Sequence, residues 1–403
     1  MKKIAGKTSQ PPTSLGNISF GKVGVGPDGE RFIWITIKLG EKRRKTLLRY
    51  DDLVSGGKAA IAKLNRLGAH LITQAAGNEF FRRLQDLGPQ NPSFKVATRV
   101  GPFGNNFVLP DQVINAAKKT FPTSFDDNLR DYLAWGRTGG ALEGWKELAE
   151  LAEGNSRLIL ALGLGFVGPL RQISPVEPFA VQLTGLGGTG KTIIGACASS
   201  IWGQRPLGGK PHPLCGGDAW NNKLNNLERV LATRDHTFLF LNEGHHVKPD
   251  DLVAAIFLIC EGQGKGRYTE IRRWEWFVPV FSTSNQSVAE TLQNAGEPLE
   301  RAAFDRLIDM PLPKAGFGAF ENLHGSATVG DFSQRIKAIY DANFGLVGRA
   351  YVLKILEALA DDKKDWRTGL KRSAHTLSVS IRCRPQLCRC CGSERLSSVE
   401  SSL

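Results

Sequence analysis

One stretch of the sequence combines residue types and spacing that suit phosphate binding. The apolar run FAVQLT leads directly into GLGGTGKT, and a second apolar run, IIGACASSIWG, follows it. Gly185, Gly190, Lys191 and Thr192 satisfy the pattern G-x-x-x-x-G-K-[ST], and the flanking runs have the strand and helix character that the motif requires. Glycines let backbone N–H groups turn inward around phosphates, while a helix N-terminus favours negative charge. The alternative is a glycine-rich turn that matches by chance.

We therefore predict a nucleotide site that takes ATP and Mg²⁺. Lys191 is expected to reach the β and γ phosphates, and the Thr192 hydroxyl is expected to bind Mg²⁺. The residues predicted to bind nucleotide are Gly185, Gly187, Gly188, Thr189, Gly190, Lys191 and Thr192.

A second apolar run, TFLFLNE, carries acid, as a P-loop site requires. Glu243 is predicted to be the catalytic carboxylate that activates water, whereas Asn242 stands where such strands usually place an aspartate facing magnesium. Asn242 is expected to keep an oxygen contact to Mg²⁺ without the negative charge, so hydrolysis is expected to be slow. His245 and His246 are interpreted as local hydrogen-bonding groups, because no second ligand pair has metal-binding spacing.

A third apolar run, FVPVFSTSN, ends in a polar cluster. Asn285 is predicted to orient the attacking water from a strand that lies between the two strands already named. The alternative is that Ser282 to Asn285 only cap a strand before a helix.

Two arginines lie in ERAAFDRLIDMPLP, at a change from helix to extended chain. In ring ATPases such a position often sends an arginine into the neighbouring subunit's nucleotide site. Arg306 is preferred to Arg301 as this catalytic arginine, because the apolar strand after it would hold its base. A surface salt bridge is the alternative.

The loop EGQGKGRYTE places Lys265 and Arg267 among glycines. Flexible basic loops can follow a phosphate backbone in the pore of a hexameric motor, so both residues are predicted to contact DNA. A simple solvated turn is the alternative.

The order of these segments predicts an α/β fold with a parallel sheet and helices on both faces, because strands and helices alternate from the phosphate motif onward. Upstream, ISFGKVGVG and RFIWITIKL flank the turn PDGE and predict a hairpin with one buried face. The expected organisation is a leader (1–17), an α+β unit (18–135), a helical connector (141–173), the P-loop core (174–320), a helical region (321–372) and a tail (373–403).

Composition limits the class of protein. The chain has 403 residues, of which 41% are hydrophobic and 23% charged, so two or three globular domains are expected. No apolar run approaches the ~18 residues of a membrane span, and the start lacks a secretion signal, so a cytoplasmic protein is expected. The net charge of +13 lies mainly on the flanks, which favours a polyanionic partner.

The ordered set of motifs resembles the domain-of-unknown-function family 927, predicted ATPases of phage, plasmid and genomic-island replication modules. The similar pieces are FVLP, LILALGLGFVGPL, GLGGTGKT with SSIWG, FLFLNE, EGQGKGR, DRLIDMPLP and ENLHG, over roughly residues 18 to 355. The resemblance implies a core similar to AAA-type or superfamily 3 helicases that acts on DNA, single-stranded or forked, as a homo-oligomer such as a hexameric ring. It also implies that Lys191 and Thr192 bind nucleotide, Glu243 activates water and Arg306 is the arginine before the apolar strand.

The tail contains a crowded cysteine set without the two separated C-x-x-C pairs of a zinc module: Cys383, Cys388, Cys390 and Cys391. It is interpreted as disordered or as an altered reading frame rather than a metal site. The leading hypothesis is an ATP-driven DNA helicase or replication ATPase of a mobile element. An ATP-dependent DNA-binding assembly protein or inactive remnant is the alternative, and a small-molecule kinase is disfavoured by Asn285 and Arg306.

Overall fold

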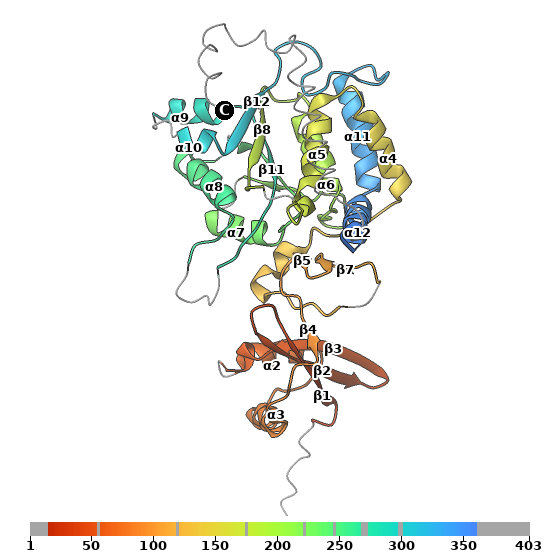
Figure 1. The fold of residues 1–403 in the computed structure, drawn as a ribbon, viewed down its shortest axis with the longest axis vertical. Helices are drawn as coiled ribbons and strands as arrows, with labels where there is room; N and C mark the ends of the chain where they lie inside the picture. Colours follow the sequence, from red (N-terminus) through yellow and green to blue (C-terminus); the bar gives the residue numbers. More distant parts are fainter. Residues whose placement is uncertain are drawn as a thin grey trace, which may run out of the picture.

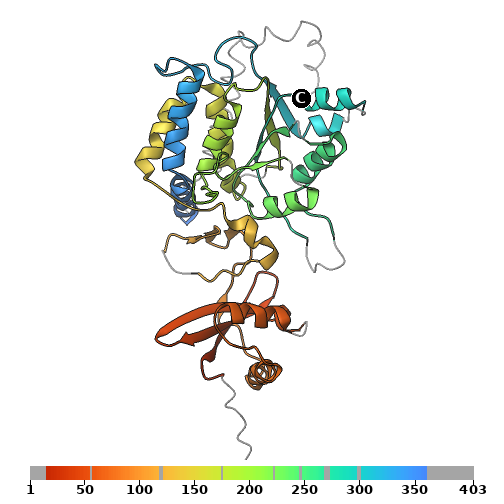
Figure 2. The same ribbon diagram turned by 180° about the vertical axis from the view of Figure 1, so that it is seen from behind.

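The computed structural model describes residues 15–54, 57–117, 121–173, 176–220, 223–244, 247–266, 273–296 and 301–360. Three layers follow one another along the longest axis of the molecule (Figure 1). The N-terminal unit lies at one end, a small sheet lies in the middle, and the sheet that carries the phosphate motif lies at the other end. Figure 2 shows the same order from behind.

The N-terminal unit is a four-stranded sheet with helices on one face. Its order is β3-β2-β1-β4, from β1 (Ile18–Val25), β2 (Arg31–Leu39), β3 (Lys42–Arg49) and β4 (Phe94–Lys95). The predicted hairpin is confirmed, since β1 and β2 pair antiparallel. Ile33, Ile35 and Ile37 are fully buried and form one core with α2 (Lys58–Arg66) and α3 (Gln74–Asp86), so the period-2 pattern identified the helix-covered face.

Strand β3 was not predicted; it follows β2 and forms the edge of this sheet. Its first four residues are all Lys or Arg, and such a run is depleted in strands. Cationic residues are common on edge strands because they discourage further pairing. The short helix α1 (Asp51–Val54) continues the chain after this strand.

The middle layer is a three-stranded sheet of order β5-β6-β7, from β5 (Gly101–Phe103), β6 (Asn106–Val108) and β7 (Val113–Ile114), followed by a 3-10 helix, η1 (Asp127–Leu133). Strands β5 and β6 pair antiparallel across a short turn. Phe107 stacks on Trp202 with ring centroids 6.2 Å apart. Since Phe107 and Trp135 belong to the same hydrophobic cluster as Trp202, the middle layer packs as part of the larger core. The predicted domain limit near residue 135 stays a prediction.

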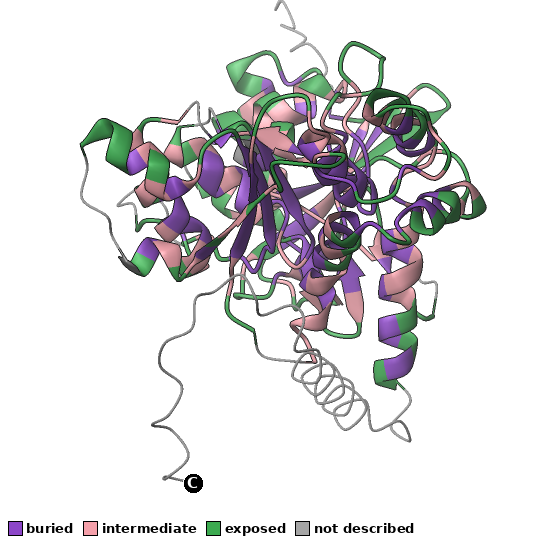
Figure 3. Cartoon of the chain, turned by 90° about the horizontal axis from the view of Figure 1, so that it is seen from above, coloured by how far each residue is buried: buried purple, intermediate pink, exposed green. Residues whose placement is uncertain are grey.

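The large layer is built on a five-stranded parallel sheet of order β12-β8-β11-β10-β9. The strands are β8 (Ala180–Thr184), β9 (Asp218–Ala219), β10 (Leu239–Asn242), β11 (Val280–Ser284) and β12 (Leu307–Pro311). The central strands β8, β10 and β11 are buried along their whole length, as expected for a parallel sheet covered on both faces. Figure 3 shows these buried strands enclosed by helices.

Helices cover both faces of this sheet. One face packs against α5 (Ser156–Leu170) and α6 (Lys191–Ser200), with α4 (Leu142–Leu151), α11 (Val329–Ala342) and α12 (Leu346–Ala360) outside them. The other face packs against α7 (Leu224–Ala232), α8 (Pro249–Glu261) and α9 (Val288–Ala295), and α10 (Arg301–Phe304) leads into β12. The predicted fold class is confirmed: an α/β P-loop NTPase fold preceded by a small α+β unit. None of the helices in the described ranges combines the length and apolar composition of a bilayer span.

Helix α5 lies within the predicted helical connector, and its glycines allow close packing. A Cβ atom at Gly168 would lie 2.2 Å from the carbonyl oxygen of Thr237, just before β10. Gly163 of the same helix is exposed, and a Cβ atom there would have nothing within 4 Å. These two glycines therefore differ in the space around them and share one helix.

We predict that Gly168→Ala destabilises the protein by about 1–3 kcal/mol, because backbone atoms cannot yield to the new methyl group. The control Gly163→Ala should stabilise it by about 0.5–1 kcal/mol, since alanine loses less backbone entropy in a helix. The free energy of unfolding in urea measures both effects. Equal effects of the two substitutions would contradict this account of α5.

Candidate functional site

The carboxyl ends of β8, β11 and β10 lie side by side and carry the predicted site residues. β11 pairs with both of the other strands, so the predicted place of Asn285, after a strand between the two others, is confirmed. Thr184, the last residue of β8, lies opposite Ser284, the last residue of β11. In open parallel sheets ligands bind outside this edge.

The loop between β8 and α6 has the backbone form that the phosphate motif predicts. Gly188 and Gly190 have φ angles of 75° and 90°, a region that L side chains rarely adopt. Gly190 is the N-cap of α6, which begins at Lys191. The first turn of the helix therefore directs its backbone N–H groups towards the loop.

Lys191 directs its ammonium group into the concave side of this loop. Nζ donates hydrogen bonds to the carbonyl oxygens of Gly185 and Leu186, each at 2.7 Å, and to Asn285 Oδ1 at 3.5 Å. Burial lowers the pKa of the Lys191 ammonium from its ordinary value. Because burial disfavours the cation, an anion placed beside it would be strongly favoured.

A hollow of about 530 Å³ opens at this edge of the sheet. The structure brings most of the predicted residues together here, from the phosphate loop and from the ends of β10 and β11. The residues that line it are Gly187, Gly188, Thr189, Gly190, Lys191, Thr192, Ile193, Asn242, Glu243, Thr283, Ser284, Asn285, Val329, Gly330, Ser333 and Gln334. The volume suits a nucleotide-sized ligand.

Asn242 joins the phosphate loop to the neighbouring strand. Its Oδ1 accepts hydrogen bonds from Thr192 Oγ1 at 3.0 Å and from Thr283 Oγ1 at 2.6 Å. The sequence analysis did not identify Thr283, although it lies in the polar tip STSN.

The oxygen donors around Asn242 fit Mg²⁺. Thr192 and Asn242 both line the hollow, and magnesium prefers oxygen ligands completed by water and substrate phosphates. Elsewhere in the described part of the chain, no group of three or more His, Cys, Asp or Glu residues is placed to hold a metal ion.

Glu243 follows β10 directly and is held in an unusual backbone conformation. Its φ angle is 65°, in the left-handed region, and its side chain is exposed at the hollow. Such a conformation costs roughly 1–3 kcal/mol and persists where the surrounding structure imposes it. The bend after Asn242 thus turns Glu243 out of the strand direction.

A series of hydrogen bonds crosses the five-stranded sheet on the face opposite to the side chain of Asn242. Trp220 Nε1 donates to Ser282 Oγ at 2.6 Å, and Ser282 Oγ donates to Gln182 Oε1 at 2.9 Å. Gln182 Nε2 donates to Asp309 Oδ1 at 2.8 Å, and Asp309 Oδ2 accepts from the backbone N–H of Val288 at 2.9 Å. Burial raises the pKa of the Asp309 carboxyl. The series ties together the segment after β9, strands β11, β8 and β12, and the start of α9.

Gly244 packs directly against this series of hydrogen bonds. A Cβ atom there would lie 3.0 Å from Gln182 Oε1 and 3.5 Å from Trp220 Nε1. The residue after Glu243 therefore lies against buried polar groups, with little room for a side chain.

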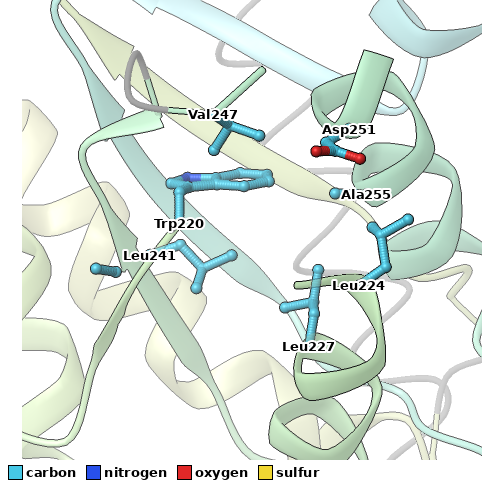
Figure 4. Close-up of a pocket in the computed structure, with 8 residues that line it drawn as sticks. Trp220, Leu224, Leu227, Leu241, Val247, Asp251 and Ala255 are labelled. Carbon is cyan, nitrogen blue, oxygen red and sulfur yellow. The ribbon is translucent and has the colours of Figure 1, made fainter. Parts of the chain in front are cut away.

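Trp220 also lines a small cavity next to these hydrogen bonds, whose other lining side chains are apolar except for Asp251. Figure 4 shows its indole below Val247, facing Leu224 and Ala255 across the space. The cavity holds about 10 Å³, which is at most the space of one water molecule. It is therefore a feature of packing and not a ligand site.

The start of α11 completes the hollow and was missed by the sequence analysis. Val329, Gly330, Ser333 and Gln334 line it, although they follow the phosphate loop by a long stretch of chain. The signal T-x-x-D marks the helix start, since Thr328 Oγ1 accepts from the backbone N–H of Asp331 at 3.1 Å. Nothing in that signal indicates which element the helix start faces.

Arg306 does not line the hollow. Its carbonyl oxygen accepts from the backbone N–H of Ala180, the first residue of β8, so it lies at the amino edge of the sheet. Its guanidinium donates to the carbonyl oxygen of Ala302 at 2.8 Å and lies 4.9 Å from the ring centroid of Phe257.

Lys265 lies in a hairpin-like stem after α8. The backbone N–H of Gly264 donates to the carbonyl oxygen of Trp274 at 2.7 Å, and that of Trp276 donates to Gly262 at 2.8 Å. Lys265 is exposed. Arg267, His245 and His246 lie outside the described residues, as does the cysteine set of the tail.

We predict that Glu243→Gly is more stable than Glu243→Ala by about 1 kcal/mol, because only glycine adopts a positive φ without strain. Urea unfolding of the two variants measures the difference. An alanine variant as stable as the glycine variant would show that residue 243 is not held in the left-handed region.

Comparisons with known proteins agree with this geometry. The model of the family described as "Domain of unknown function (DUF927)" matches residues 10–271. No curated protein matches the chain in sequence. The structure titled "SCCmec type IV Cch - active helicase" aligns at 18% identity and a TM-score of 0.61, covering 91% of this chain and 65% of that chain. The present chain thus spans 65% of the length of that helicase structure, and the likeness shows a shared fold.

Two further solved structures are similar over smaller or looser matches. The apo structure of the NrS-1 C-terminal region aligns at 12% identity and a TM-score of 0.35, covering 86% of this chain and 72% of that chain. NtrX from Brucella abortus aligns at 14% identity and a TM-score of 0.26, covering 57% of this chain and 54% of that chain. Since the family model matches more than half of the residues, the chain belongs to the DUF927 family.

Proposed function

We propose that this protein is an ATP-binding and slowly ATP-hydrolysing, helicase-like ATPase that acts on DNA during replication of a mobile genetic element. The observation that carries the proposal is the meeting of Lys191, Thr192, Asn242, Glu243 and Asn285 around one hollow. These residues come from three separate parts of the chain, and each has the chemistry that one step of phosphoryl transfer requires. The fold shared with a structure titled as an active helicase supports the same class of protein.

The residues divide the work of binding and hydrolysis. The backbone N–H groups of the loop and of the first turn of α6 receive the phosphates, and the Lys191 ammonium neutralises their charge. Thr192 and Asn242 would hold Mg²⁺, which supplies positive charge to the phosphate oxygens when bound. Glu243 polarises the attacking water and receives its proton, while Asn285 orients that water by hydrogen bonding.

The position of Arg306 supports action across a subunit interface. It lies at the amino edge of the sheet, whereas its own hollow lies at the carboxyl edge. A catalytic role for Arg306 therefore requires the hollow of a neighbouring copy, as in a homo-oligomeric ring. The proposed assembly is a hexameric ring.

The stem after α8 supports the proposed contact with DNA. Lys265 and Arg273 lie on its two paired segments, and exposed basic residues there can contact a phosphate backbone. The alternative function is an assembly protein that binds ATP and DNA but hydrolyses poorly. Asn242 favours it, because a neutral amide replaces a carboxylate at the metal.

We predict that Lys191→Ala abolishes nucleotide binding, because it removes the one cation of the phosphate loop. The exposed Lys354→Ala, whose lysine pairs with Glu357 on α12, is the control and should bind as the unmodified protein does. Fluorescence anisotropy of a labelled ATP analogue measures affinity, and circular dichroism verifies folding. If folded Lys191→Ala bound the ATP analogue with unchanged affinity, the assignment of the nucleotide site would be wrong.

We predict that Asn242→Asp raises the rate of hydrolysis, by up to roughly 10²-fold, because it restores a preorganised negative charge beside Mg²⁺. The aspartate can still accept both threonine hydrogen bonds that Asn242 Oδ1 accepts. Glu243→Gln should eliminate hydrolysis, since an amide cannot take the proton of water. Phosphate release, with and without single-stranded DNA, measures both. If neither substitution changes the rate, β10 does not carry the catalytic groups.

A further inference from the structure

We propose that the face of the N-terminal sheet opposite α2 and α3 binds single-stranded nucleic acid. The inference deepens the proposed function and rests on its nucleic-acid partner. We call this surface the open face. It is the side of β1–β4 on which Trp34 and Phe94 lie, and the isoleucines of β2 lie on the other side. Phe32, Leu47 and Val96 are buried on this side, so its exposed part is the end near Trp34 that carries the cations of β2 and β3.

The charge of the sheet has one sign. Every charged residue in its four strands is Lys or Arg: Lys22, Arg31, Lys38, Lys42, Arg43, Arg44, Lys45, Arg49 and Lys95. The carboxylates of this unit lie in the turns between the strands, at Asp28, Glu30 and Glu41, and on the helices, as with Glu79, which binds Arg82 and Arg83 on α3. The uniformly cationic strands favour a polyanion on the strand side.

The strand register assigns several of these cations to the open face. Residues directly opposite one another in paired strands point to the same side. Lys38 lies opposite Arg43, Thr36 opposite Lys45, and Trp34 opposite Leu47. Lys38, Arg43 and Lys45 are exposed, and none of the three forms an ion pair with another described residue. Lys42 and Arg44 alternate with them and therefore point to the helix-covered side.

Aromatic rings lie beside these cations. The half-buried rings of Trp34 and Phe94 have centroids 6.3 Å apart, and Arg49 lies 5.6 Å from the ring centroid of Phe32. A Cβ atom at Gly24 would lie 2.3 Å from the Phe94 ring, so this glycine makes room for the ring on the sheet. Cations next to aromatic rings on an open sheet form the combination that holds a single strand, by phosphate contacts and base stacking.

A duplex is the less suitable partner, because its bases are already stacked and cannot reach a flat aromatic surface. Figures 1 and 2 show the N-terminal sheet at one end of the molecule and the sheet that contains β8, β11 and β12 at the other. The hollow lies at the carboxyl edge of that second sheet. A strand bound there would therefore be held apart from the site of hydrolysis.

The test compares two double variants with equal loss of charge. Arg43→Ala/Lys45→Ala changes the open face, and Lys42→Ala/Arg44→Ala changes the helix-covered side of the same strand. Anisotropy of labelled oligo(dT) in a series of salt concentrations measures binding by the full chain. The slope of log K against log salt concentration is negative. The open-face variant should make this slope less negative by roughly 1.4, about 0.7 for each lost phosphate contact. The control variant should leave the slope unchanged.

Trp34 tests the stacking component. Trp34→Leu should weaken oligo(dT) binding roughly fivefold or more, whereas Trp34→Phe should retain it, since the ring is kept. Equal slopes for the two double variants would overturn the proposal. It would also be overturned if the protein bound a duplex as tightly as oligo(dT) and Trp34→Leu did not change oligo(dT) binding.

Hydrolysis of ATP without DNA separates this proposal from the proposed function, because none of these positions lies near the hollow. If the protein hydrolyses ATP but all variants bind oligo(dT) equally, only the open-face proposal is refuted. If oligo(dT) binding changes as expected but the protein releases no phosphate, only the proposed ATPase function is refuted.

Discussion

A single side-chain oxygen, Oδ1 of Asn242, accepts hydrogen bonds from Thr192 on α6 and Thr283 on β11. Three elements that are distant in sequence meet at this buried atom. Because each donor is a hydroxyl with a short side chain, the phosphate loop, the second apolar strand and the third are held within a narrow range of positions. The hollow has its shape because these three elements cannot separate without leaving a polar group unpaired.

On the opposite face of the five-stranded sheet, a second set of hydrogen bonds stabilises the same carboxyl edge. There, Trp220, Ser282, Gln182 and Asp309 form a continuous chain of hydrogen bonds across the strands. Polar groups buried in a sheet are costly unless all of them are paired, so this chain restricts the register of the strands as well as stabilising them. Gly244 rests on it, and the left-handed backbone of Glu243 is held between the two networks.

The separation of functions along the molecule follows from how each layer is built. Parallel strands buried on both faces leave only their ends for chemistry, and the ATP hollow lies at such an edge. The N-terminal sheet is antiparallel over β1, β2 and β3 and is covered by helices on one face. On its other face Phe32 and Leu47 are buried, and the end of the sheet that carries Lys38, Arg43 and Lys45 is exposed and available for binding. The middle layer, which shares the core of the large sheet through Phe107 and Trp135, lies between them.

The phosphate loop was predictable from the sequence because its chemistry is local: glycines, a lysine and a hydroxyl within one turn, between a strand and a helix. The place of Asn285, after a strand that lies between the two other named strands, was also predicted correctly. Three features depended on tertiary structure. Gln334 reaches the hollow because α11 returns to it after a long excursion, and a helix signal carries no direction. Arg306 lies at the far edge because its strand runs parallel to β8, so its distance from the hollow is set by the length of that strand. Strand β3 forms despite its cationic sequence because pairing with β2 supplies backbone hydrogen bonds that local propensity does not count.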